Sequence, residues 1–166
     1  MANLAAISWT TPYVGGSIPY VCVADQKAQN TAGGTFTTGA DQTRTLNTIT
    51  ADSHGIAFLA SNQLWLPAGV YRFSVSAPAY ACQRHQAWLY NVTAGAVVER
   101  GTSAFSSTSN PDQTLSLISG RVRVLSRTAF EVRHRCSSTS TTQGFGVEAN
   151  FGVEVYTVAE FWRETT

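Results

Sequence analysis

The chain has 166 residues, of which 13% are charged, and its formal net charge is +1. This length fits one domain that can bury a sizeable core. The few charged residues and their near-neutral balance argue against a nucleic-acid-binding protein, which would neutralise phosphates with clustered Lys and Arg. No stretch is apolar for long enough to span a membrane, so we expect neither nucleic acid nor membrane as a partner.

Residues 1–17 are predicted to form an arm, separate from one domain over residues 18–166. The arm mixes Trp9, Pro12 and Tyr13 with glycines and shows no period. Aromatic side chains in such a segment indicate docking, either onto a partner or onto the protein's own domain, whereas the alternative is a flexible terminus. The segment has no basic start and no apolar run typical of a signal peptide, so we expect synthesis in a cytosol.

Short strands are predicted along the first half of the domain, at 18–24, 43–49 and 56–59. Pro67-Ala68-Gly69 then reverses the chain. From Tyr71 to Ala77 apolar and polar residues alternate, which predicts a strand with one buried and one wet face. Pro78 is expected to end this strand because proline cannot donate to a ladder. A strand over 84–92 follows so closely that we expect the two to pair antiparallel.

Further strands are predicted at 97–100, 115–125 and 130–136, with a last one within 145–162. Two loops rich in Ser and Thr separate them, at 102–113 and 137–143. The total is about ten short strands, and no segment keeps a helical period. The predicted class is therefore all-β, a sandwich or a barrel.

The last predicted strand has apolar side chains on both faces. An exposed strand of a soluble monomer would have a polar outer face, so we expect burial of both faces, between sheets or against another subunit. A symmetric oligomer would cover such a surface economically. The residues predicted for this interface are Tyr156, Val158, Phe161 and Trp162.

The sequence offers no set of residues typical of catalysis or metal binding. Cys22, Cys82 and Cys136 cannot all pair within one chain; we expect free, at least half-buried thiols, with one disulfide and a spare thiol as the alternative. His85 and His134 are isolated in sequence and expected to be structural. No zinc spacing, GxSxG, HExxH, phosphate-binding loop or GxGxxG occurs, so no metal, no cofactor and no enzymatic activity is expected.

Several segments together resemble a family of bacteriophage virion proteins, and the similarity covers about residues 20–162. They are CVADQKAQNTAGGTF, TRTLN, LPAGVYRFSVSAPAY, RHQAWLYNV and HRCSSTSTTQGFG. Members occur as knobs of tail fibres or as small separate virion proteins. The family is similar to the jelly roll of complement C1q and tumour necrosis factor (TNF), which assembles as compact trimers. The resemblance therefore implies a jelly-roll β-sandwich that forms a homotrimer, with its C-terminal strand near the threefold axis.

The resemblance leads to three hypotheses about function. Fibre proteins of this kind usually carry a long shaft, but the arm here has no heptads and no Gly-X-Y repeat. The first hypothesis is therefore a short spike, decoration or short fibre knob at the virion surface, anchored by its arm to other capsid or tail proteins, with adhesion to the host or its environment as a role that it could serve.

The second hypothesis is a carbohydrate-binding tip of the tail that recognises a host-surface glycan. The third is a polysaccharide depolymerase, which is disfavoured because the sequence has no set of acid–base or nucleophilic residues. Hydroxyl-rich loops could face the host, although most such loops are merely soluble. The candidates are Ser106, Thr108, Asn110, Ser138 and Thr141.

Overall fold

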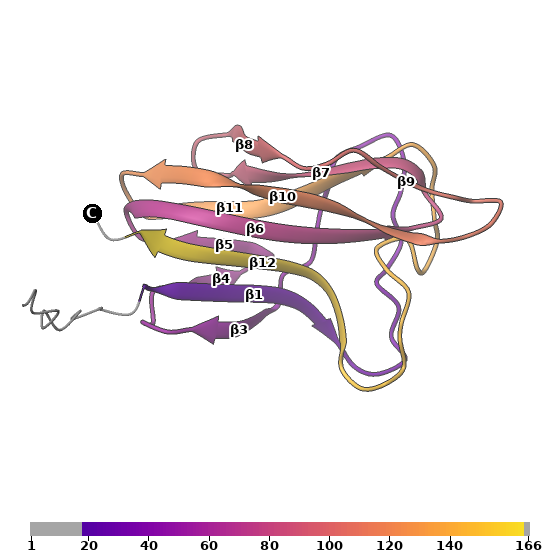
Figure 1. The fold of residues 1–166 in the computed structure, drawn as a ribbon, viewed down its shortest axis with the longest axis horizontal. Coiled ribbons are helices and arrows are strands. Elements are labelled where there is room, and N and C mark those ends of the chain that lie inside the picture. Colours follow the sequence, from indigo (N-terminus) through magenta and orange to yellow (C-terminus); the bar gives the residue numbers. More distant parts are fainter. Residues whose placement is uncertain (1–17, 165–166) are drawn as a thin grey trace, which may run out of the picture.

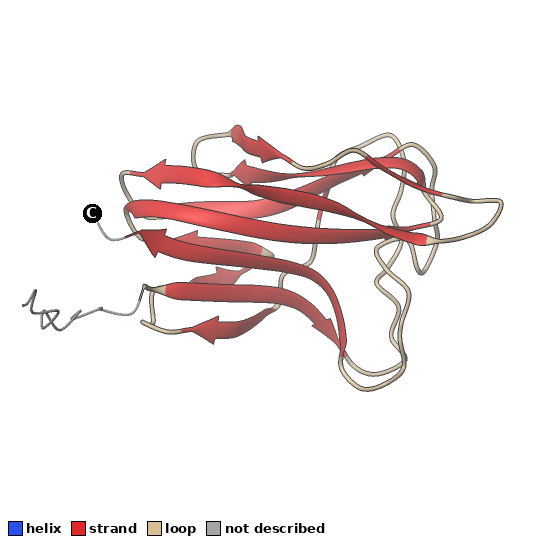
Figure 2. Ribbon diagram, in the orientation of Figure 1, coloured by secondary structure: helices blue, strands red, loops and turns tan. Residues whose placement is uncertain are grey.

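The computed structural model describes residues 18–164, which form two antiparallel sheets packed face to face (Figures 1 and 2). Twelve strands occur in this part of the chain, compared with about ten predicted. They are β1 Tyr20–Lys27, β2 Gln42–Thr43, β3 Thr48–Asp52, β4 Phe58–Ala60, β5 Gln63–Leu66, β6 Gly69–Tyr80, β7 Gln83–Asn91, β8 Ala96–Arg100, β9 Ala104–Ser106, β10 Gln113–Val124, β11 Thr128–Cys136 and β12 Glu154–Glu164. Within residues 18–164 no helix is long and apolar enough for a membrane span.

The five-stranded sheet has the order β10-β6-β12-β1-β3. The seven-stranded sheet has the order β4-β5-β11-β7-β8, with β2 added on β11 and β9 on β7. The first and last strands of the described chain, β1 and β12, are direct antiparallel neighbours in the middle of their sheet. The predicted all-β class is confirmed, and the architecture is a two-layer sandwich.

The main core lies between the inward faces of the two sheets. The predicted alternation on β6 is confirmed, because Tyr71, Phe73 and Val75 are all buried in this core. Phe161 of β12 packs between Phe73 and Phe130, with ring centroids 5.9 and 6.0 Å away. Burial of each such side chain contributes about 1.5–3 kcal/mol.

The strands before and after residue 81 do not form the expected hairpin. β6 belongs to the five-stranded sheet and β7 to the seven-stranded sheet, so the chain crosses between layers here. Ala81 and Gln83 have φ angles of 48° and 61°, which turn the backbone sharply around Cys82. β6 and β7 are therefore placed in opposite sheets rather than hydrogen-bonded to each other.

Pro78 does not end its strand, because β6 continues to Tyr80. Backbone groups two residues apart on a strand point to the same side, so Tyr80 shows which way position 78 faces. The N–H of Tyr80 donates to Gly144 O, on the side of β6 away from β10. On that side β12 pairs with β6 only up to Ser76. Pro78 has no N–H to donate, but it faces a side of β6 on which no strand pairs at this position. The pairing of β6 with β10 is therefore not interrupted.

The strand predicted over 43–49 is divided between the two sheets. β2 pairs with β11, whereas β3 pairs with β1. Arg44 lies at the crossing, and its side chain is fully buried. Its guanidinium donates to Thr157 Oγ1 at 2.7 Å, to the carbonyl of Pro78 at 2.9 Å and to the carbonyl of Phe145 at 2.8 Å. This one side chain therefore ties together four segments that are distant in sequence.

Candidate functional site

The outward face of the five-stranded sheet carries the candidate site. On β12, Val158, Glu160 and Trp162 point outward, whereas Ala159 and Phe161 face the core. The register places Val158 and Leu117 on either side of Ser76. Side chains from β10, β6 and β12 therefore form continuous rows across this face.

An apolar patch occupies part of this face. Leu115 and Leu117 of β10 are 47% and 51% exposed, and they lie two residues apart on the same side of the strand. Half-buried Val158 continues the patch across Ser76. We refer to Leu115, Leu117 and Val158 as the apolar patch. Contiguous exposed apolar side chains of this kind mark surfaces that bind another molecule.

A shallow hollow of about 1130 Å³ lies beside the apolar patch on the same face. Its lining includes the small residues Ser74, Ser119 and Gly120. Gly120 pairs opposite Phe73, and a Cβ atom there would come within 2.7 Å of Cζ of Phe73 on the core side, so this position does not accept a side chain without moving the core. At its rim Arg121 and Glu164 form an ion pair at 2.6 Å. The face thus presents both a protruding apolar part and a recess.

Only two of the four residues predicted for the interface lie on this open face. Val158 and Trp162 do so, and the ring of Trp162 lies 5.5 Å from that of Tyr20. Phe161 is 1% exposed and is a core residue of the single subunit, because strand alternation turns it away from Trp162. Tyr156 is also buried within the subunit, where its hydroxyl donates to the carbonyl of Thr31 at 2.7 Å.

The predicted host-facing residues differ in exposure. Ser106 is fully buried on β9 and donates to Asp112 O, so it cannot contact a host surface. Thr108, Asn110 and Thr141 are exposed, and Ser138 is half-buried. The long loops lie at the end of the sandwich opposite the start of β1 and the end of β12 (Figure 1). The predicted anchoring residues Trp9, Pro12 and Tyr13 lie outside the described part of the chain.

A buried polar cluster joins residues that the sequence left separate. His85 Nδ1 lies 3.0 Å from His134 Nε2, and His85 Nε2 lies 2.8 Å from Thr114 Oγ1. Burial, helped by the nearby charge of Arg44, lowers the pKa of His85 to about 4, and the same causes lower the pKa of His134. Both histidines are therefore neutral at pH 7. Their pairing has no local sequence signal, because 49 residues separate them.

All three cysteines are free, with Cys82 and Cys136 buried in a small cluster beside Phe36 and Cys22 half-buried, which confirms the first expectation. Within residues 18–164 no group of three or more His, Cys, Asp or Glu side chains is placed to hold a metal ion.

Comparison with known proteins identifies the fold. The chain matches no protein-family model and no curated protein. Among solved structures it is similar to the globular domain of the zebrafish complement 1qA protein, with a TM-score of 0.56, 14% identity, and coverage of 89% of this chain and 98% of that chain. It is similar to murine APRIL, with a TM-score of 0.56, 6% identity, and coverage of 89% and 100%. The described chain therefore has the jelly-roll fold of the C1q and TNF domains.

Proposed function

We propose that this protein is a non-enzymatic structural protein of a bacteriophage virion, and that it forms a homotrimer through the outward face of the five-stranded sheet. The observation that carries the trimer is the apolar patch beside a hollow on one sheet face. A soluble subunit would gain by covering such a face, and a closed symmetric assembly covers it in every copy.

The size of the gain supports association through this face. Leu115 and Leu117 are each about half exposed, so complete burial contributes about 1 kcal/mol each. Six leucines in a trimer therefore contribute about 6 kcal/mol, against about 8 kcal/mol at the lower end of the cost of the two association steps that form a trimer. Val158, Trp162 and the rest of the face supply the remainder.

The assignment to a virion rests on the motifs that resemble phage virion proteins. The shape of the subunit supports the same role, because the described chain begins and ends at one end of the sandwich and presents its long loops at the other (Figure 1). Residues 1–17 would attach such a knob to capsid or tail proteins, and the loops would point away from the particle. The protein would be made in the host cytoplasm and reside on the virion surface.

A carbohydrate-binding tip of the tail is the second candidate function. It is favoured by the exposed hydroxyl and amide side chains of Thr108, Asn110 and Thr141 in loops at the end of the sandwich away from the chain ends. Adsorption of the purified protein to host cells, absent for a pure decoration protein, separates the two candidates.

Light scattering tests the trimer. We expect three times 17.8 kDa, about 53 kDa, for the wild-type chain. Leu117→Asp should reduce the mass to that of one subunit, because each trimer would have to bury three carboxylates. Leu125→Asp is the matched control, since Leu125 is 82% exposed in the turn after β10 and outside the apolar patch. A monomeric wild type, or equal disruption by both variants, would contradict the proposed interface.

Analysis of purified phage particles tests the virion assignment separately. Mass spectrometry of the particles should detect this chain in multiple copies, and antibody labelling should place it on the surface. Its absence from particles would end the structural role even if the protein proved trimeric.

A further inference from the structure

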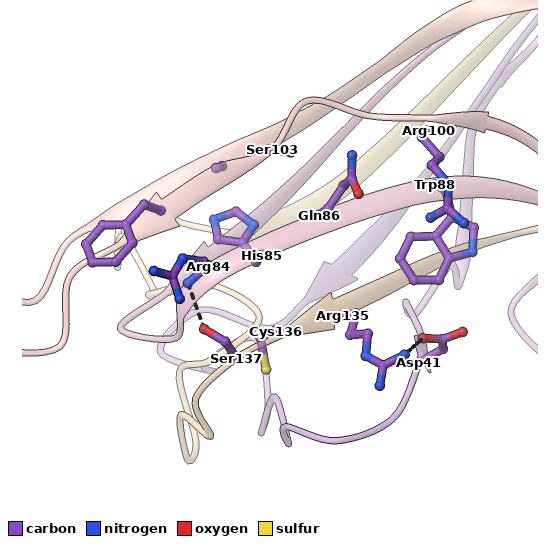
Figure 3. Close-up of a pocket in the computed structure, with 12 residues that line it drawn as sticks. Asp41, Arg84, His85, Gln86, Trp88, Arg100, Ser103, Arg135, Cys136 and Ser137 are labelled. Atoms are coloured by element: carbon purple, nitrogen blue, oxygen red, sulfur yellow. Dashed lines mark hydrogen bonds and ion pairs between the residues drawn. The ribbon is translucent and has the colours of Figure 1, made fainter.

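A groove of about 690 Å³ lies on the outward face of the seven-stranded sheet (Figure 3). It is separate from the apolar patch, which lies on the other sheet. Strands β7, β8, β9 and β11 of a single subunit supply most of its walls. An assembly through the five-stranded sheet would therefore leave this groove open.

The sheet register gathers arginine and aromatic side chains in this groove. β7 supplies Arg84 and Trp88 on the same outward side. Phe105 of β9 pairs opposite Arg84, and Arg100 of β8 pairs opposite Trp88. Arg135 of β11 pairs opposite Gln86, between these two rows. We refer to Arg84, Arg100, Arg135, Trp88 and Phe105, with Asp41, as the basic groove.

The basic groove has an excess of positive charge. Three arginines against one aspartate give a charge of +2, whereas the whole chain has +1. Asp41 is engaged by Arg135, with Nη1 and Oδ1 3.3 Å apart. Among residues 18–164, neither Arg84 nor Arg100 forms an ion pair, and both are exposed. Arg100 is held over the ring of Trp88 at 5.1 Å, so its guanidinium is positioned without being neutralised.

The spacing of the two free charges points to a chain-like ligand. Arg84 lies on β7, and Arg100 lies opposite a position four residues further along β7. Their backbones are therefore about 13 Å apart in the direction of the strand. The guanidinium of Arg100 is held over the ring of Trp88, so a small anion bound there leaves Arg84 available for a second acidic group. A polymer with an acidic group on successive units can place one on each, and Arg binds such planar or tetrahedral anions with two parallel hydrogen bonds.

An exposed aromatic ring lies beside one of these charges. Phe105 is 57% exposed and stands opposite Arg84 on the edge strand β9. Its flat apolar face suits the C–H face of a sugar ring, while a charged substituent of that ring would reach Arg84. Binding of nucleic acid is disfavoured, because two free arginines neutralise few phosphates.

We propose that the basic groove binds an acidic polysaccharide, with sugar rings against Phe105 and anionic groups of separate sugar units on Arg84 and Arg100. This goes beyond the assembly proposed above and does not depend on it, since one subunit forms most of the groove.

Calorimetric titration of the full chain tests the proposal. The probes are an oligogalacturonate, a phosphorylated mannan oligosaccharide, the fully methyl-esterified oligogalacturonate and single-stranded DNA of similar charge. We expect binding of at least one acidic oligosaccharide and none of the neutral ester; the two acidic probes distinguish carboxylate from phosphate as the group bound. Binding of neither acidic probe, or equal binding of the neutral ester, would overturn the proposal. Tighter binding of DNA would assign the groove to nucleic acid instead.

Variants locate the binding site. Arg84→Gln and Arg100→Gln should each weaken binding about tenfold, and Phe105→Ser should weaken saccharide binding by a similar factor. Arg127→Gln is the control, because it removes the same charge from the exposed turn between β10 and β11. Unchanged circular dichroism and melting temperature would show that the variants are folded. An equal loss with Arg127→Gln would reduce the effect to overall charge and refute the site.

Discussion

Stability between pH 6.5 and 4 should depend on the buried pair His85 and His134. Burial lowers the pKa of His85 from an ordinary 6.5 to about 4, and Arg44 adds repulsion. Because the folded-state pKa lies below the unfolded one, the unfolded chain binds more protons in this window. Stability is therefore complete above about pH 6.5 and is lost as the pH falls toward 4.

The expected loss can be worked from the shift. A change from 6.5 to about 4 corresponds to about 3 kcal/mol, and water in the groove beside His85 screens part of this, which leaves about 2 kcal/mol. The pKa of His134 is lowered in the same direction, so the pair should cost at least this much. Asp25 acts with opposite sign, because burial raises its pKa and its protonation favours the folded state.

Urea unfolding at fixed protein concentration and at pH 7.5, 6, 5 and 4.5 measures this loss. His85→Asn should be less stable at pH 7.5 but should show a flatter pH dependence. His54→Asn, which changes an exposed histidine in the turn after β3, should keep the wild-type slope. A wild-type stability that is constant from pH 7.5 to 4.5 would refute the reasoning.

Three substitutions test the packing of the sandwich. Phe161→Ala should lower the free energy of unfolding by about 3–5 kcal/mol, because it empties a site between Phe73 and Phe130; a loss below about 1 kcal/mol in urea unfolding would show that the ring is not in the core. Arg44→Met should lower the free energy of unfolding by about 2–4 kcal/mol, because three buried acceptors lose their donor while the burial of a charge is relieved. A variant as stable as wild type would mean that the desolvation cost of the guanidinium equals the gain from its hydrogen bonds. Gly120→Ala should lower the melting temperature, because the new methyl group would press on Phe73, and a calorimetric scan matching wild type would show that the ring yields freely.

Local alternation was sufficient to predict most strands and their buried faces. It could not predict that β6 and β7 belong to different sheets, because this crossing depends on the backbone conformation of Ala81 and Gln83. Neither residue is the glycine that usually signals a positive φ. The burial of Arg44 could not be predicted for the same reason. In the sequence it is an ordinary polar strand residue, and only the fold brings its three acceptors, on Pro78, Phe145 and Thr157, to its guanidinium.

The candidate site was predicted only in part. Apolar residues on both sides of β12 indicate burial of both faces. The pattern alone does not say which side is the core, and for this reason the sequence places Phe161 at the interface. The patch on β10 was missed because Leu115 and Leu117 belong to a regular alternating strand that reads as half-buried. The basic groove depends on the pairing of four strands, which no single stretch of sequence reveals.

The position of β12 between β6 and β1 has a consequence for synthesis of the protein. A nascent chain that has reached only the end of β11 has a gap in the centre of the five-stranded sheet, with the flanking edges of β1 and β6 unpaired. Folding of the domain must therefore wait until residue 164 has left the ribosome, and until then a strand from a neighbouring nascent chain can enter the gap. Translation that stops within β12 should yield insoluble product rather than a shortened domain.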